Sequence, residues 1–159
     1  RGTAYHRVME CLNYSKAGST EDIKNEIDRM VREEKLSLKQ AECIKLKDID
    51  TFAGSSIGER IKRAYAYGGV KREQPFVFEY DRQLVQGVID LYFIEDGQLV
   101  IVDYKTDRVL RGRAGEDELR RRYSIQLDYY AMALSQITGL KVKEKVIYSF
   151  ALGRSLTVE

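Results

Sequence analysis

The chain has two cysteines, Cys11 and Cys43, and it has one proline and no tryptophan. Two thiols cannot supply the four ligands of an all-cysteine zinc site or of a four-cysteine iron–sulfur cluster. They also provide no disulfide scaffold of the kind found in small secreted proteins. We therefore expect two buried free thiols, no iron–sulfur cluster in this chain and a cytoplasmic location.

Long apolar runs are also missing. No stretch approaches the roughly 18 apolar residues that a membrane helix needs, so no membrane partner is expected. A length of 159 residues predicts one domain, 1–159, and the net charge of +2 permits a nucleic-acid partner without requiring one. The chain starts at Arg1 and lacks a GxxxxGK[ST] phosphate loop, so we expect a piece of a larger protein without a motor of its own.

Two kinds of periodicity divide the chain. Residues 1–69 show helical spacing, and 70–159 show mainly strand alternation around one long helix. The predicted pieces are helices over 3–14, after Ser19, over 37–44, 48–53 and 56–67, antiparallel strands over 70–80, 84–94 and 98–106, a mobile loop over 108–117, a helix over 118–138 and a last strand over 142–152. This order predicts an α/β fold in which a mixed sheet carries helices on its faces.

A predicted hairpin brings two carboxylates together. Asp96-Gly97 is a strong two-residue turn signal between alternating apolar residues. Counting outward from this turn places Asp90 opposite Asp103, with Cβ atoms roughly 4.5–5.5 Å apart. Two ionised carboxylates at that separation repel each other unless one is protonated or a cation lies between them. A divalent metal with oxygen ligands meets this need, and solvated hairpin acids are the alternative.

Lys105 and Tyr104 follow the second aspartate. Lys105 lies two residues after Asp103 and therefore points to the same face, where its ammonium could stabilise charge that develops on a phosphate. An edge-strand lysine that prevents aggregation is the alternative. Tyr104 points to the opposite face, so only its backbone carbonyl could reach a metal there. We expect this lysine to make no ion pair.

These residues resemble a known family. GVID followed by VDYKTD resembles the core of the PD-(D/E)XK nucleases, in the RecB-like branch, and especially the C-terminal nuclease domains of AddA subunits of bacterial helicase–nucleases. Three further elements match in the same order along the chain: Gly2-Thr3-Ala4-Tyr5-His6 as GxxxH, Arg72-Glu73-Gln74-Pro75-Phe76 as the preceding strand, and Gln126-Leu127-Asp128-Tyr129-Tyr130 as QxxxY.

The resemblance implies a restriction-endonuclease-like core with an N-terminal helical part, and a Mg2+- or Mn2+-dependent deoxyribonuclease in bacterial double-strand-break repair. It implies that His6 is a metal ligand with Asp90, Asp103 and the Tyr104 carbonyl, although an isolated helical histidine is more often structural. The implied partners are DNA, ATP-dependent helicase domains of the parent chain and another helicase–nuclease protein chain as second subunit.

Other residues have weaker assignments. Gln126 and Tyr130 are four apart and share a helix face, and the resemblance places them near the DNA backbone and Lys105. Glu73 either supports the site through a hydrogen bond to one of its ligands or faces solvent. An arginine-rich stretch is a candidate DNA contact or a solvated face, and its members include Arg108, Arg111, Arg113, Arg120, Arg121 and Arg122.

Two other functions stay open. A domain of the same fold could bind DNA or a partner without catalysis, although the complete set Asp90, Asp103 and Lys105 argues against this. A standalone nuclease of phage or defence type is the second, and the absent start methionine argues against it.

Overall fold

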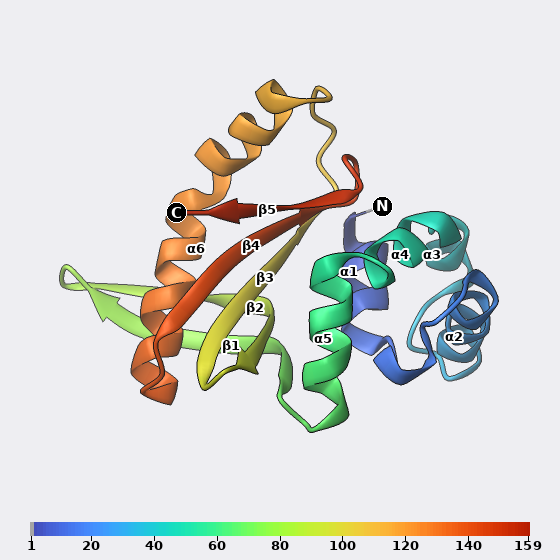
Figure 1. The fold of residues 1–159 in the computed structure, drawn as a ribbon, viewed down its shortest axis with the longest axis horizontal. Coiled ribbons are helices and arrows are strands. Elements are labelled where there is room, and N and C mark those ends of the chain that lie inside the picture. The colour runs from blue at the N-terminus through green and yellow to red at the C-terminus, as the bar shows by residue number, and fades with distance from the viewer. Residues whose placement is uncertain (1) are drawn as a thin grey trace.

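The computed structural model describes residues 2–159 and contains one five-stranded sheet with helices on both faces (Figure 1). Neighbouring strands are antiparallel, except that β3 and β4 are parallel and are connected by the long helix α6 (Arg113–Thr138). This mixed sheet confirms the expected α/β fold class. The strands follow the chain order across the sheet: β1 (Val70–Tyr80), β2 (Gln83–Glu95), β3 (Gln98–Lys105), β4 (Val142–Ser149) and β5 (Arg154–Val158).

Short helices make up the first part of the chain. Their starts follow the capping signals of the sequence: the Ser19 side chain accepts a hydrogen bond from the Asp22 N–H, and Ser37 forms a capping box with Gln40. The elements are α1 (Gly2–Cys11), the 3-10 turn η1 (Tyr14–Lys16), α2 (Thr20–Arg32), α3 (Leu38–Glu42), α4 (Leu46–Ala53) and α5 (Ser56–Ala66).

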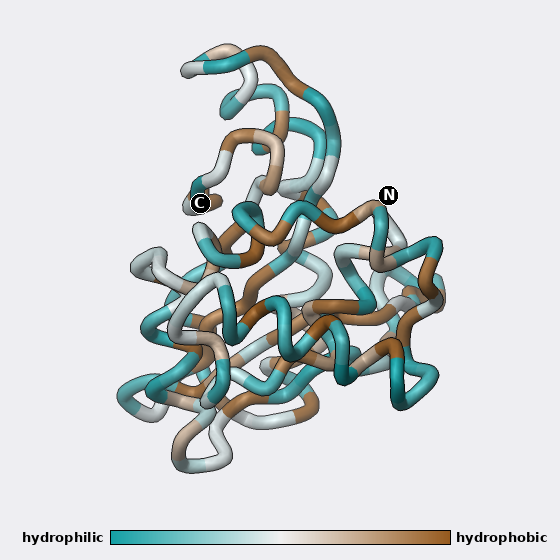
Figure 2. The backbone as a smooth tube through the Cα atoms, turned by 90° about the vertical axis from the view of Figure 1, so that its right-hand side faces the viewer, coloured by the Kyte–Doolittle hydropathy of each residue, from teal (hydrophilic) through white to brown (hydrophobic). Residues whose placement is uncertain are grey.

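The sheet separates two hydrophobic clusters. One cluster joins α1–α5 to one sheet face, and the other joins α6 to the opposite face. Brown hydrophobic stretches of the backbone run through the middle of the molecule, whereas most outer turns are teal or white (Figure 2). Because β3 has apolar residues on both faces, it is buried almost throughout and forms the centre of the sheet.

The hairpin between β2 and β3 is confirmed. Asp96 and Gly97 have φ angles of 53° and 71°, and Glu95 pairs with Gln98 across them. Positive φ at both central residues is the signature of the turn type that matches the twist of a two-residue hairpin. The turn residues therefore set the register of the two strands that carry the aspartates.

Three sequence predictions of secondary structure are corrected. Helix α6 begins at Arg113, inside the stretch expected to be a mobile loop. Gly115 lets the preceding segment pack closely against the helix, because a Cβ at position 115 would lie 1.8 Å from the Leu110 carbonyl oxygen. The last strand ends at Ser149, and the chain turns back to form β5, which the sequence prediction missed. The first helix ends at Cys11, before the predicted end at 14.

The cysteine prediction is partly wrong. Cys11 is half-buried, but Cys43 is exposed at the end of the short helix α3. Its thiol donates a hydrogen bond to the Lys39 carbonyl over 3.3 Å. In residues 2–159, no helix has the length and apolar character needed to cross a bilayer.

Candidate active site

Asp90 and Asp103 lie where β2 and β3 separate. The ladder between these strands ends with Leu91 opposite Val102, so both aspartates lie one residue beyond the last pair. The predicted register is therefore correct, although the two acids are not themselves a ladder pair. Asp90 Oδ2 instead accepts a hydrogen bond of 2.9 Å from the Tyr104 N–H. This bond fixes the Asp90 carboxylate beside the end of β3.

The side chains of strand β2 switch between the two faces of the sheet irregularly at Asp90. Ile89 belongs to the cluster under α6, whereas Leu91 belongs to the cluster under the N-terminal helices. Residues two apart on a regular strand share a face, so the strand must be distorted between them. On the neighbouring strand, Glu73 has a left-handed φ of 49°, and the β1–β2 ladder omits the pair between Glu73 and Asp90.

Glu73 therefore lies beside the candidate site, half-buried on a distorted strand. Burial and the negative charge of Asp90 raise the pKa of the Glu73 carboxyl group above its usual range. Glu73 makes no side-chain hydrogen bond to any of the described residues, so the supporting bond considered from the sequence is not seen. Its role in the site stays a prediction.

Lys105 is held by three neighbours. Its Nζ lies 2.9 Å from Asp103 Oδ2, donates to Gln126 Oε1 over 3.2 Å, and sits 3.9 Å from the centroid of the Tyr123 ring. The prediction that this lysine makes no ion pair is wrong, because the side chain folds back along the face that it shares with Asp103. The ammonium is thereby pre-positioned next to the buried acid.

His6 approaches the same acids from helix α1. Its Nδ1 lies 2.9 Å from the Gly2 carbonyl oxygen, which can only accept, so Nδ1 is the donor. Its Nε2 lies 3.2 Å from Asp90 Oδ2. The hydrogen bond that His6 donates to Asp90 outweighs burial and raises the pKa of His6 to about 9. The GxxxH spacing thus fixes the ring so that Nε2 points at the acids.

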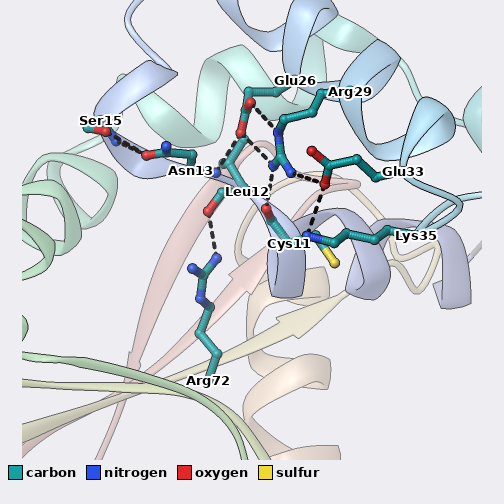
Figure 3. Close-up of polar contacts among 9 residues, drawn as sticks. All are labelled: Cys11, Leu12, Asn13, Ser15, Glu26, Arg29, Glu33, Lys35 and Arg72. Atoms are coloured by element: carbon teal, nitrogen blue, oxygen red, sulfur yellow. Dashed lines mark hydrogen bonds and ion pairs between the residues drawn. The ribbon is translucent and has the colours of Figure 1, made fainter.

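The carbonyl end of α1 is anchored by two arginines. Arg29 donates to the Cys11 carbonyl oxygen over 2.9 Å, and Arg72 of β1 donates to the Leu12 carbonyl oxygen over 2.6 Å (Figure 3). Arg29 is itself held by Glu26, whose side chain is almost fully buried. These bonds satisfy helix-end carbonyls and fix the helix that carries His6.

Helix α6 supplies the other wall. Gln126 accepts from Lys105, and Tyr130 is buried with its ring edge-on to Phe76 at 5.5 Å between centroids. Burial, followed by the charges of Asp103 and Asp90, raises the pKa of the Tyr130 hydroxyl. Gln126 therefore lies at Lys105, as the resemblance implied, and Tyr130 lies near enough to the acids for their charges to raise its pKa.

Tyr104 lies on the opposite face, as predicted. Its side chain is buried among the N-terminal helices, and its hydroxyl lies 3.2 Å from that of Tyr14. Only its backbone belongs to the site face. The metal contact expected of its carbonyl oxygen stays a prediction.

The arginine-rich stretch divides into two sets. Arg120 and Arg122 pair with carboxylates of the same region, including Asp117 and Asp107. Tyr123 donates to that same Asp107 over 2.6 Å, which links the loop after β3 to α6. The other set is exposed or half-exposed and makes no ion pair with a described residue: Arg108, Arg111, Arg113 and Arg121.

The acids differ in proton affinity. Burial would raise the pKa of Asp90, but bonds from His6 and the Tyr104 N–H lower it below its usual range. Burial and the charge of Asp90 raise the pKa of Asp103, and Lys105 opposes this rise only in part. The pair is therefore asymmetric, with the negative charge preferentially on Asp90.

The donor set suits a divalent ion. In the described part of the chain, no three His, Cys, Asp or Glu side chains form a ready metal cage, and His6 and Lys105 are paired with the acids. However, Asp103 Oδ2 is buried and accepts no well-formed hydrogen bond from a described residue. An imidazole nitrogen and carboxylate oxygens are suitable ligands for Mg2+ or Mn2+. Their role as ligands stays a prediction.

The mixed sheet brings two acids and a lysine together, which is the arrangement that the resemblance to nucleases implied. The chain belongs to the PD-(D/E)XK nuclease superfamily, whose family model matches residues 1–156. That range contains every candidate site residue described above.

Two curated relatives carry the same name, that of the A subunit of an ATP-dependent helicase/nuclease. The chain is 40% identical to this protein from Thermoanaerobacter sp. (strain X514), over 98% of the chain and 14% of the relative. It is 36% identical to the protein of the same name from Clostridium novyi (strain NT), over 94% of the chain and 13% of the relative. The chain thus spans about an eighth of the length of these relatives.

Proposed function

We propose that the chain is a metal-dependent DNA nuclease that hydrolyses phosphodiester bonds of single strands, in double-strand-break repair. The observation that supports this most strongly is the convergence of His6, Asp90, Asp103 and Lys105 in one hydrogen-bonded cluster, from three separate elements. The names of the relatives favour a strand delivered by a helicase, and the proposal includes exonuclease action on that strand.

Each residue has a defined task in this proposal. His6 Nε2, the two aspartates and the Tyr104 carbonyl oxygen would hold Mg2+ or Mn2+. A divalent ion supplies polarisation of the phosphate and a lowered pKa of the attacking water. Asp90 is the better anion of the pair, since the His6 and Tyr104 bonds favour its charged form.

Lys105 stabilises the charge that develops on the phosphoryl oxygens. Its ammonium is already oriented by Gln126 and Asp103, so little reorganisation accompanies the reaction. Tyr130 keeps its proton at neutral pH and is available as a donor. The unpaired arginines, Arg108, Arg111, Arg113 and Arg121, would contact the DNA backbone.

The test is cleavage of a labelled single-stranded oligonucleotide by the chain in chelator, Mg2+ and Mn2+. We expect cleavage only with metal, and loss of about 10²-fold or more in rate for Asp90→Asn and Asp103→Asn. An exposed-acid variant, Asp28→Asn, is the matched control. Metal-independent cleavage, or full activity in Asp90→Asn, would contradict the proposal, and no cleavage under any condition would favour a silent binding domain.

Delivery by a motor is the second part of the proposal. A net charge of +2 gives little long-range attraction to phosphates, so the chain by itself should bind DNA weakly. Helicase domains of a longer parent chain and a second protein chain of the complex would raise the effective concentration of the strand at the site. The bacterial cytoplasm is the compartment that the proposal implies. Sub-micromolar affinity of this chain for single strands at moderate salt would show that delivery is unnecessary.

A further inference from the structure

A groove lies beside the acid–lysine cluster, next to Gln126 and Tyr130. It has a volume of about 410 Å3 and lies where α6 crosses the β1–β2 hairpin (Figure 1). Small-molecule sites typically have volumes of about 300–1,000 Å3. The groove is lined mainly by aromatic and apolar residues: Phe76, Val85, Gly87, Ile125, Tyr129 and Tyr130.

The groove is continuous with the candidate active site. Gln126 lines it and also accepts the hydrogen bond from Lys105 Nζ. Tyr130 lines it too, and the charges of both aspartates help to raise the pKa of its hydroxyl. A nucleotide whose phosphate lies at Lys105 would therefore place its sugar and base within reach of this groove.

Its aromatic walls are fixed before any ligand binds. Phe76 packs edge-on against Tyr130 at 5.5 Å, and Tyr129 is held between Phe78 at 6.2 Å and Tyr80 at 5.7 Å between centroids. Fixed rings lose little conformational freedom on binding, which favours affinity. Gly87 lets the Phe76 ring lie against strand β2, because a Cβ there would lie 3.0 Å from that ring.

The rim explains which ligand fits. Ile125 is 65% exposed and offers an apolar side chain at the rim of the groove. Arg122 stands at the same rim, where its guanidinium is paired with Asp107 and Glu118. The aromatic, apolar floor suits an unpaired base, and Lys105, which Gln126 connects to the groove, supplies the cation for its phosphate.

We propose that this groove holds an unpaired nucleobase next to the scissile phosphate, through Ile125, Tyr129 and Phe76. The inference rests on the proposed nuclease function, because it takes the phosphate position from that site. A base paired in a duplex is stacked on both sides and cannot enter such a groove. The groove would thus select single strands over duplexes, independently of sequence.

The test separates base contacts from phosphate contacts. Binding of the chain to a fluorescent oligothymidylate and to a fully abasic strand of equal length is measured in chelator, where no cleavage occurs. Protein is titrated to about 100 µM, the weak end of non-specific DNA binding. We expect the base-bearing strand to bind about tenfold more tightly. Ile125→Ala should reduce the ratio of the two affinities about threefold, without changing the affinity for the abasic strand.

Ile137→Ala is the matched control, since Ile137 is an isoleucine of the same helix, is 54% exposed and does not line the groove. Tyr129→Leu keeps apolar bulk, removes the ring face and should also reduce the preference. Equal affinity for the two strands, an equal loss for both in Ile125→Ala, or no binding of either strand would overturn the proposal. Metal-dependent cleavage is measured separately, so a nuclease with no base preference is a distinct outcome.

Discussion

His6 Nε2 lies 3.2 Å from Asp90 Oδ2, although the two residues belong to the first helix and to a strand in the second half of the chain. Asp90 also accepts from the Tyr104 N–H, so one carboxylate connects three elements of the fold. The site is therefore assembled only when α1 docks on the sheet. This dependence links the packing of the N-terminal helices to the proposed chemistry.

Metal binding should require both His6 and Asp90. In calorimetric titration with Mn2+, we expect Asp90→Ala to abolish binding and His6→Ala to weaken it at least about tenfold, because each removes a ligand atom. Asp28→Ala, which removes an exposed carboxylate of α2, should bind as the parent chain does. Undiminished Mn2+ affinity in Asp90→Ala would refute the assignment.

Replacing Lys105 by methionine should affect both rate and stability. The cleavage rate should fall by about 10²–10³, because a preorganised cation for the developing charge is lost. The melting temperature of the metal-free protein should also fall, since the buried Asp103 carboxylate loses its ion-pair partner. Lys24→Met on the exposed side of α2 is the control for both measurements. Wild-type turnover in Lys105→Met would remove this residue from the mechanism.

The acid stability of the fold should depend on Glu95. This carboxylate accepts two bonds from Arg60, at 2.9 and 3.0 Å, and pairs with Lys143, and the Arg60 bonds lower its pKa to about 2. Because the folded-state pKa is depressed, the stabilisation is fully present above about pH 4.5 and is lost as the pH falls toward 2.

Urea unfolding of Glu95→Gln tests this dependence. At pH 7 we expect a loss of about 1 kcal/mol, reduced by solvent screening because the side chain is 23% exposed. The difference from the parent chain should shrink below about pH 4.5. Glu59→Gln, which breaks an exposed pair with Lys62, should change stability by no more than a few tenths of a kcal/mol. A Glu95 effect that is constant between pH 7 and pH 3 would contradict the ion-pair account.

Removing Arg29 should destabilise the helical part. Arg29→Met leaves the buried Glu26 carboxylate without its cation and frees the Cys11 carbonyl, which should cost about 3 kcal/mol in the free energy of unfolding. Arg32→Met, one turn later and exposed, should have little effect. Adding Glu26→Met to Arg29→Met should restore part of the loss, because the unpaired charge is gone. No recovery in the double variant would argue against a charge effect.

Local signals in the sequence determined much of the fold. The Asp96-Gly97 turn, the serine caps at Ser19 and Ser37, and Gly139, which ends α6 with a left-handed φ of 71°, each act within a few residues. Such interactions are readable because their geometry depends only on neighbouring positions. The same local counting gave the register of the aspartates and the face of Lys105.

Tertiary packing decided the remainder. Strand β5 and the early start of α6 depend on contacts with other segments of the fold, so no local pattern in the sequence predicted them. The ion pair of Lys105 with Asp103 and the distortion opposite Asp90 at Glu73 likewise required the folded sheet. The sequence by itself determined which residues are available for the chemistry. Only the tertiary structure decided which of them meet, because proton affinities and ion pairs depend on burial and on neighbours that are remote in the chain.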